Sequence, residues 1–534
     1  MSLLTGKNSH RAVLAIALLA LFLPVIYIEL TLLQYTHGTI AYPLDDTFIH
    51  MAVAKNLAFE KVWGISKFSF QSASSSPLYT VVLAGSFLLF GMHLIIPLLI
   101  NAAAAIIFLV ALQKWLIQQG FDAKSQLIIL LLVIFLTPLP VLVICGMEHT
   151  LQLLFCFLFI YSFSRFAPSG RLPWSVFIYG LLMVTTRYET MAIVGIACLL
   201  LLRQKKWWTA ILLGAISVLP IVMFGIMAMS KGSYFMPNSV LIKSTAPPLT
   251  IDGLTDFFVN IFWFKLFFAA QDMNFLSAQR LLLLLPVTYL FFAVNIRQIT
   301  EYRYITAILL GAAFAHISFA FYFPFFFPRY EAYLIGCSVV IILSFAIRNG
   351  PNMFVERIQG VEWAGLIVFA ILALPLVFRS GYALRDIKRD CINIYDQQYQ
   401  MAKFVHAYYD KAPIALNDIG AVSYYSNGNK LDLVGIASLD VVKSKKLGYW
   451  SPSFADSLAR QQSIKLAIVY DSWFTPDLLR RWNKVATWQI QNNLICGDSV
   501  VSFYTIDPAD ILQLKQDLLS FQRELPAGVV TRYY

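Results

Sequence analysis

A series of long apolar segments constrains this chain more than any other feature of its sequence. The first runs from about Ala12 to Gln34, and about 20 apolar residues are enough for a helix to cross a bilayer. Of the 534 residues, 59% are hydrophobic and 13% are charged, whereas an average soluble protein carries about 25% charged residues. The sequence therefore predicts a polytopic α-helical membrane protein.

Further apolar segments follow between breaks, and together they predict about eleven to thirteen membrane helices. Several are too short to cross alone, which is tolerated where helices surround a protein-lined or water-filled cavity. The first segment lacks a small-residue cleavage site, so it is expected to stay as an anchor. The later segments are Pro77–Phe90, Ile95–Leu116, Leu127–Cys145, Leu151–Ser164, Trp174–Thr186, Met191–Leu202, Thr209–Met229, Leu281–Ile296, Tyr304–Phe323, Ala332–Ile347 and Glu362–Phe378.

Basic residues indicate which side of the membrane each loop faces. Lys7 and Arg11 precede the first span, and basic clusters at residues 203–208 and 297–303 fall between later spans. Lys and Arg collect on cytoplasmic loops. The N-terminus is therefore expected inside the inner (cytoplasmic) membrane, and the first loop and everything after Phe378 outside it. The net charge of +11 follows from this bias and requires no nucleic-acid partner.

One segment does not fit this count of crossings. Lys114–Ser125 is basic and should be cytoplasmic, yet counting spans from the first loop puts it outside. One element between Pro77 and Leu116 is therefore expected to be half-length or re-entrant.

From about Arg379 to Tyr534 the composition becomes that of a soluble domain, which divides the chain into a membrane domain (1–378) and an extracytoplasmic domain (379–534). A helical pattern at Gln397–Tyr409 is followed by short strand-like runs, which predicts a small α/β domain. No glycine-rich phosphate-binding motif is present. The strand-like runs are PIALND, KLDLVG, IKLAIVYD and SVVSFYTI.

The six cysteines divide by location. Four lie in apolar runs and are expected to pack as small hydrophobic side chains. Cys391 and Cys496 are the two in the outer domain, on the oxidising side of the membrane, so the sequence predicts a disulfide between them. Closing a loop of about 100 residues would contribute roughly 4.7 kcal/mol in the chain-entropy model. No Cys or His spacing typical of zinc sites is present.

Two adjacent acids, Asp45 and Asp46, lie in the first outer loop at about residues 35–76. One interpretation is that either carboxylate caps a helix over Thr47–Phe59, whose mixed pattern predicts an interfacial amphipathic segment. A cap accounts for one acid but not for two. The alternative is a functional pair just outside the membrane.

The residues around this pair resemble the GT-C superfamily, polytopic glycosyltransferases that use a polyprenyl-phosphate sugar as donor. The terminal arabinofuranosyltransferases of mycobacterial cell walls are the nearest subgroup. The resemblance covers most of the chain, although each motif is short and a tyrosine replaces the family's proline after Arg187. The motifs are AVAKNLAFEKVWG and SSSPLYTVVLAG behind the acids, GMEHT (146–150), TTRYET (185–190), MPNSVLIKS (236–244), FPRYEAYL (327–334) and LNDIGAVSYYSNGNKLDLVGI (416–436).

The resemblance implies a transfer from a lipid phosphate to a hydroxyl group of a glycan, lipid or protein acceptor in the cell envelope. Such a transfer passes through an oxocarbenium-like state, with a carboxylate as the base for the acceptor. Asp45 is the preferred base. Asp46 would orient the acceptor or a divalent cation, which is the one cofactor that the resemblance leaves open.

Cations must hold the anionic leaving phosphate. Lys243 and Arg329, at the outer ends of spans, are the candidates, and the alternative for each is a cation that snorkels to the interface. Arg187 makes either a substrate contact or a structural ion pair with Glu189. The full predicted substrate-binding set is Lys243, Arg329, Glu148, Arg187 and Tyr330.

Two other classes of function stay open at this point. A transporter or flippase of lipid-linked sugars would place acids within spans and show inverted repeats, whereas these acids lie in a loop and no repeat is visible. A structural or sugar-binding membrane protein would have its outer domain as the active part. The expected partners are the lipid-linked donor, an acceptor and membrane lipids.

Overall fold

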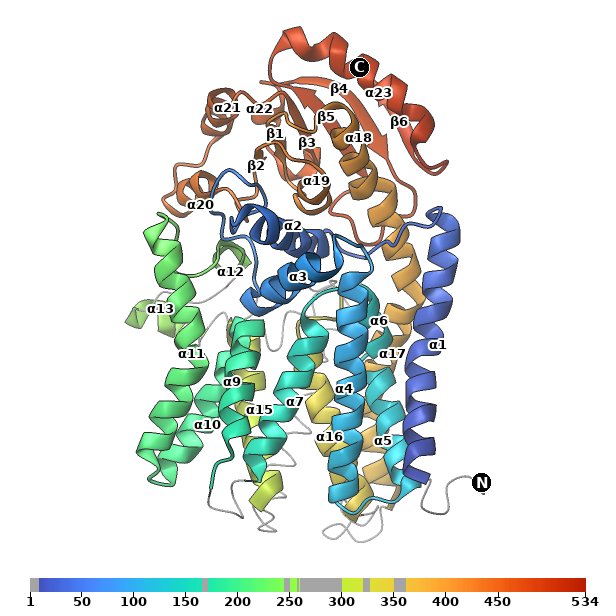
Figure 1. Cartoon of the computed structure of the whole chain (residues 1–534), viewed down its shortest axis with the longest axis vertical. Helices are drawn as coiled ribbons and strands as arrows, with labels where there is room; N and C mark the ends of the chain where they lie inside the picture. Colours follow the sequence, from blue (N-terminus) through green and yellow to red (C-terminus); the bar gives the residue numbers. More distant parts are fainter. Residues whose placement is uncertain are drawn as a thin grey trace.

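The computed structural model describes residues 9–165, 171–243, 250–256, 259, 300–319, 327–349 and 362–534. Long helices run side by side in a bundle, and an α/β domain covers one end of it (Figure 1). Helix α1 begins at the opposite end. The bundle helices are α1 Ser9–Tyr35, α4 Ile96–Gln118, α5 Ala123–Leu136, α6 Leu139–Cys145, α7 His149–Ser164, α9 Trp174–Thr186, α10 Met191–Arg203, α11 Trp207–Ser230, α15 Thr300–Phe319, α16 Ala332–Asn349 and α17 Glu362–Ile394.

Three of these helices in the described part of the chain, α1, α4 and α11, are long and apolar enough to cross a membrane. The pair α5 and α6 adds a fourth span if it counts as one, since it bends by 48° at its break. The predicted segment Leu127–Cys145 is thus broken near Pro138. These helices are those of a multi-pass membrane protein, while the number of eleven to thirteen crossings stays a prediction. The predicted span Leu281–Ile296 lies outside the described residues.

Two helices lie across the end of the bundle that faces the α/β domain: α2 (Asp45–Glu60) and α3 (Pro77–Phe90) (Figure 1). Helix α3 starts as its sequence predicts, with Pro77 in its first turn and the Ser76 side chain accepting the backbone N–H of Tyr79. Because α3 does not run along the bundle, α4 ends beside the start of α1. Lys114–Ser125 therefore lies at the same end as the N-terminus, as its charge predicts.

Helix α2 corrects two expectations. It begins at Asp45 itself after Leu44, whose side chain makes no capping hydrogen bond, so neither acid is the predicted cap. Every residue from Thr47 to Ala54 is buried. The helix packs against α3 below and against α19 (Gly420–Tyr425) of the α/β domain above. It is therefore a buried link between the two parts of the protein and not an interfacial amphipathic helix.

The α/β domain is built on a six-stranded sheet in the order β2-β1-β3-β5-β4-β6. Strand β1 pairs in parallel with β2 and β3, and the other pairs are antiparallel. The four predicted strand-like runs form β1, β2, β3 and β5, which confirms the α/β class. The strands are β1 Ile414–Leu416, β2 Lys430–Asp432, β3 Leu466–Val469, β4 Asn483–Gln489, β5 Val500–Thr505 and β6 Val530–Tyr533, and the larger helices are α18 Gln400–Tyr408, α20 Leu439–Lys446, α21 Pro452–Gln461 and α23 Ile511–Phe521.

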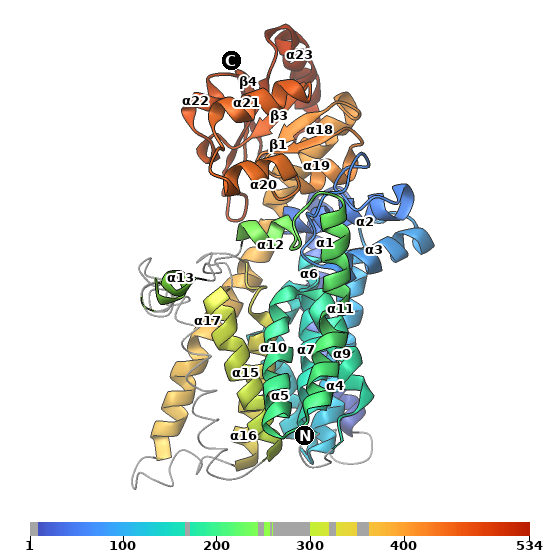
Figure 2. The ribbon, with the colours of Figure 1, turned by 90° about the vertical axis from the view of Figure 1, so that its left-hand side faces the viewer.

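One continuous helix joins the bundle to the α/β domain. Helix α17 spans 33 residues and continues through a π-helical turn at Tyr395–Tyr399 into α18. Figure 2 shows this helix running from the bundle up to the domain. The predicted boundary at residue 378 therefore falls inside a helix, and no flexible linker separates the two parts at that point.

The predicted Cys391–Cys496 disulfide is wrong, because both thiols are free and buried. Cys391 packs in the apolar core of the bundle, whereas Cys496 belongs to the core shared by α2 and the sheet. The Cys496 thiol instead donates to Oε1 of Gln398 at 3.4 Å. Their assignment to one outer domain did not predict that they pack in two separate cores.

Candidate active site

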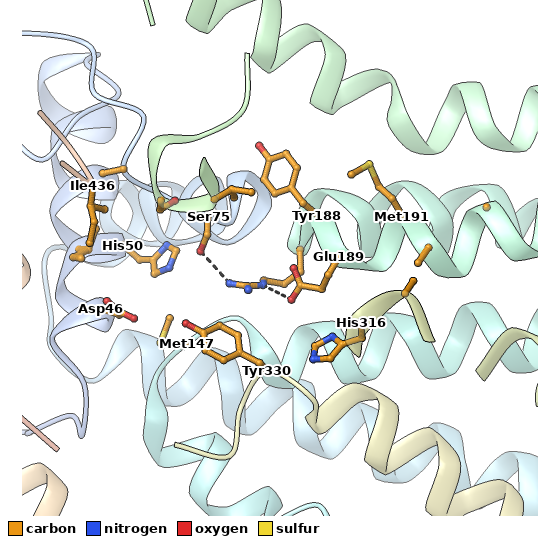
Figure 3. A pocket seen from close by; sticks show the side chains of 18 of the residues that line it. Asp46, His50, Ser75, Met147, Tyr188, Glu189, Met191, His316, Tyr330 and Ile436 are labelled. Atoms are coloured by element: carbon orange, nitrogen blue, oxygen red, sulfur yellow. Dashed lines mark hydrogen bonds and ion pairs between the residues drawn. The ribbon is translucent and has the colours of Figure 1, made fainter. Parts of the chain in front are cut away.

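A cavity of about 780 Å³ lies where α2, the turn between α9 and α10, and the start of α12 (Asn238–Lys243) meet beneath the α/β domain. Figure 3 shows its two ends. Asp46, His50 and Ile436 lie at one end, and Met191 and His316 lie at the other. The first end holds the polar side chains of Asp46 and His50 beside apolar ones such as Ile436, and the second is lined by the bundle.

The bundle end is apolar because one face of α10 lines it. The lining positions 191, 192, 195, 196 and 199 are spaced so that they share one side of a helix. Gly195 has no atom within 4 Å of where a Cβ would be, so the absence of a side chain leaves open space there. The cavity is thus amphiphilic, with a polar end under the α/β domain and an apolar trough inside the bundle.

Asp46 faces the cavity and pairs with Arg329, whose Nη2 lies 2.6 Å from Oδ2 of Asp46. The Arg329 side chain is only 1% exposed. A buried guanidinium requires a compensating charge, and Asp46 supplies it. The structure therefore places Arg329 behind the carboxylate and not on the cavity wall, where a direct phosphate ligand would lie.

Asp45 lies elsewhere, in the contact between α2 and the α/β domain. Its two carboxylate oxygens accept the backbone N–H groups of Gly420 at 2.6 Å and of Ala421 at 2.8 Å. Burial, together with the charge of Asp418, raises the pKa of Asp45 from 3.8 to about 8. Of the two adjacent acids, only Asp46 is part of the cavity lining.

A network of buried charges continues from Asp46 along the cavity. Arg187 donates to Oε1 of Glu148 at 2.8 Å and to Oε1 of Glu189 at 2.8 Å, and Ser75 accepts a further bond from it (Figure 3). The ion pair with Glu189 is the structural alternative that the sequence left open. Arg187 and Glu189 also line the cavity, so the pair is part of the site.

His50 joins this network from α2. Its Nε2 lies 3.3 Å from Oε2 of Glu148, and its Nδ1 lies 3.1 Å from the hydroxyl of Ser74. Burial lowers the pKa of His50, and this effect outweighs the charges of Glu148 and Asp46, which raise it. His50 is therefore a neutral hydrogen-bonding group at neutral pH.

Tyr330 connects the two arginines. The guanidinium carbon of Arg329 lies 4.7 Å from the ring centroid and that of Arg187 lies 5.3 Å from it. Both distances are within the range of cation–π attraction. The phenol oxygen also accepts a bond from Nη2 of Arg329 at 3.0 Å. The ring lines the cavity between its two ends, so Tyr330 is brought into the site together with Asp46, Arg187 and Arg329.

Helix α12 covers part of the cavity. Ser239 and Val240 line it, and the hydroxyl groups of Ser239 and Tyr188 are buried without a hydrogen-bond partner in the part of the chain that the structure describes. Unpartnered buried hydroxyls at a cavity wall can bind a polar ligand. The backbone of Lys243 ends α12, one turn after Ser239, and its side chain lies outside the described residues.

Among the described residues, no group of three or more His, Cys, Asp or Glu side chains is placed to hold a metal ion. The two carboxylates at the polar end, Asp46 and Glu148, each pair with an arginine. These residues do not fit a divalent cation, which prefers several oxygen ligands.

The fold that holds this cavity is similar to that of a protein of known structure. The structure superposes on a crystal structure of ArnT from Cupriavidus metallidurans bound to undecaprenyl phosphate with a TM-score of 0.53 and 11% sequence identity, covering 95% of this chain and 99% of that one. The apo structure of the same protein gives 0.53 and 10%, covering 93% and 98%. The chain has the ArnT fold.

ArnT is a GT-C glycosyltransferase, so the resemblance read from the sequence is confirmed at the level of the fold. The arabinofuranosyltransferase subgroup is not confirmed. Residues 391–504 also match a family described as a domain of unknown function, DUF8728. A comparison with curated protein sequences gives no match.

Sequence reasoning missed several cavity residues, among them His50, Ser75, Tyr188, Ser239 and Ile436. A signal existed for some of them. Ser75 and Ser239 lie inside quoted motifs, and polar residues that interrupt apolar surroundings are candidates for a site. Ile436 is the last residue of a quoted motif (416–436), but it is apolar, so nothing in its residue type marked it as part of a site.

Proposed function

We propose that this protein is a membrane glycosyltransferase that moves a sugar from a polyprenyl-phosphate donor to a hydroxyl group of an extracytoplasmic acceptor. The observation that carries the proposal is the amphiphilic cavity, with Asp46 at its polar end and the α10 trough at its apolar end. A lipid-linked sugar has the same two-part chemistry. The shared fold with ArnT, which has been crystallised with undecaprenyl phosphate, supports this class of donor.

The donor would lie with its prenyl chain along α10 and its phosphate near Arg187. Charge bookkeeping at the polar end favours a further cation there. Among the side chains that the structure describes there, two arginines, Arg187 and Arg329, face three carboxylates, Asp46, Glu148 and Glu189. An anionic phosphate needs positive charge nearby, and Lys243 at the end of α12 is our candidate to supply it.

In the proposed reaction the acceptor oxygen attacks the anomeric carbon of the donor sugar. The bond between that carbon and the phosphate oxygen breaks, and its electron pair leaves with the polyprenyl phosphate. Asp46 takes the proton of the acceptor hydroxyl. We prefer Asp46 to Asp45 as the base, because Asp46 lines the cavity and Asp45 is bonded to backbone N–H groups of α19.

Replacement of the Asp46 carboxylate tests the proposal. Asp46→Asn should lower the rate of sugar transfer by about 10²–10⁴-fold, the range for loss of a general base. Transfer is measured by mass spectrometry as the release of polyprenyl phosphate from lipid-linked sugars extracted from native membranes. Binding of undecaprenyl phosphate in detergent should persist, and Asp46→Glu, which keeps the charge beside Arg329, should retain some activity.

Asp477→Asn is the matched control, since the Asp477 side chain is 76% exposed and lies in the α/β domain. It should leave transfer unchanged. Full transfer by Asp46→Asn would reject the role of Asp46. Movement of lipid-linked sugars across vesicles, without any release of polyprenyl phosphate by the wild-type protein, would instead favour the flippase alternative.

A further inference from the structure

Ile436 brings the α/β domain into the wall of the cavity. The residue belongs to the loop between β2 and α20 and lines the cavity beside residues of α2. It lies within the region 391–504 that matches a domain of unknown function. Figure 2 shows α20, to which this loop leads, directly above α12.

The loop that carries Ile436 is held by its own hydrogen bonds. The buried carboxylate of Asp432 accepts the backbone N–H groups of Val434 at 2.8 Å, Gly435 at 3.1 Å and Ala437 at 2.6 Å. Gly435 has a φ of +95°, a conformation that favours glycine. The position of Ile436 relative to the sheet is thus set within the domain itself.

The position of the domain relative to α2 is also fixed, because α2 holds both ends of α19. Asp45 accepts the N–H groups of Gly420 and Ala421 at the first end. At the other end, Nζ of Lys55 donates to the carbonyl groups of Ser423 at 3.1 Å and Tyr424 at 2.7 Å. Asp45 thus holds the first residues of α19 and Lys55 holds its last ones.

Asp46 lies on the same helix as Asp45 and Lys55. These contacts therefore fix the position of the α/β domain, and with it Ile436, relative to Asp46. Figure 3 shows Ile436 at the end of the cavity that holds Asp46 and His50, away from Met191 and His316. In the proposed function, the prenyl chain of the donor occupies the apolar trough at the far end of the cavity. The surface beside Asp46 is where the hydroxyl to be deprotonated would have to lie.

We propose that the α/β domain forms the acceptor side of the site and that Ile436 is a specificity-determining residue for the acceptor. This inference rests on the proposed function. An isoleucine offers no hydrogen bond, so it would pack on a carbon surface next to the reacting hydroxyl. The C–H face of a sugar ring and the carbon chain of a lipid acceptor share this chemistry.

The test compares Ile436→Ser and Ile436→Val in the full-length protein, with donor and acceptor varied separately. Ile436→Ser should lower kcat/KM for the acceptor by about tenfold, the size expected for loss of an apolar contact in a pocket. Its KM for the donor and its Kd for undecaprenyl phosphate should not change. Ile436→Val, which keeps the apolar contact, should stay close to the wild-type protein.

Leu512→Ser is the control for a polar substitution elsewhere in the domain, since Leu512 is 73% exposed. It should behave as wild type. Donor and acceptor parameters that fall together in Ile436→Ser, or that do not change, would overturn the inference while transfer by the wild-type protein upholds the proposed function. Absence of transfer by the wild-type protein would reject the proposed function itself. An acceptor series differing in carbon surface distinguishes a sugar ring from a lipid chain.

Discussion

Asp45 and Asp46 are adjacent in the chain but serve different parts of the molecule. Successive residues on a helix point about 100° apart, so the first turn of α2 directs Asp45 to α19 and Asp46 to the cavity. In the sequence, a helix cap could account for one of the two acids but not for both. The sequence did not show which acid faces which surface, because that depends on α19, 375 residues further along the chain.

The environment of Asp45 predicts a pH dependence of stability. The pKa of Asp45 rises from 3.8 to about 8 on folding, so the folded state binds this proton more tightly than the unfolded state. The contribution of Asp45 is therefore fully present below pH 3.8 and is lost as the pH rises through about 8. We expect the melting temperature of the wild-type protein to fall over this range.

Asp45→Asn, which cannot ionise, should remove that part of the pH dependence, so its deficit in melting temperature should be largest at pH 5 and shrink towards pH 9. Thermal melts of purified protein across this range provide the measurement. Asp418→Asn should lower the pKa of Asp45, since the charge of Asp418 is one cause of the raised pKa, so the fall in melting temperature with pH should be smaller and end at a lower pH. Parallel pH profiles for wild type and Asp45→Asn would contradict the assignment.

At the scale of elements, hydrophobic periodicity predicted the bundle well. Residues Trp174–Thr186 form α9 with the predicted bounds, and α10 and α11 begin and end within two residues of their predicted positions. The missed strands had weaker signals. Strand β4 carries Asn483, Lys484 and Gln489, and β6 is a short, partly exposed edge strand. Their pairing depends on β5, which no local pattern reveals.

Two expectations concerned residues far apart in the chain: the clustering of site residues and the disulfide. Clustering of Asp46, Arg187, Arg329 and Tyr330 agrees with motifs that the resemblance supplied. The disulfide was inferred by elimination, and packing in separate cores overruled it. Local patterns predict elements, whereas contacts between distant elements require the fold.

The contact between α2 and α19 requires a glycine. A Cβ on Gly420 would lie 2.1 Å from the backbone oxygen of Asp45, far closer than atoms can approach. Gly420→Ala should therefore separate the two helices, lower the melting temperature and reduce transfer. Gly381→Ala is the matched control, because a Cβ there has no atom within 4 Å and alanine favours the α17 helix.

The measurements for this pair are thermal melts and the transfer assay on purified protein. The control should be as stable as the wild-type protein or slightly more so. If Gly420→Ala melts and transfers like Gly381→Ala, then the close approach of α2 and α19 does not hold the domain in place.

For the whole molecule, the two ends of the bundle should face opposite sides of the membrane. Leu512 is 73% exposed in the α/β domain, and Lys124 is exposed at the start of α5, which lies at the same end of the bundle as the start of α1. A cysteine at residue 512 should react with a membrane-impermeant maleimide in intact cells or spheroplasts. A cysteine at residue 124 should react only after permeabilisation.

The native cysteines give this labelling experiment a low background, since five of the six are buried. Labelling of the wild-type protein measures the background from the sixth, Cys198. Labelling of residue 124 and not of residue 512 in intact cells would invert the proposed orientation and put the cavity on the cytoplasmic side.

The bond between Asp45 and Gly420 also sets a timetable for biosynthesis. Its partners are 375 residues apart, so at about 5–20 residues per second the ribosome adds Gly420 roughly 20 to 75 seconds after Asp45. During that interval Asp45 lacks its partners in α19. A product truncated before β1 would keep most of the residues that line the cavity but would lack Ile436 and the contact between α2 and α19.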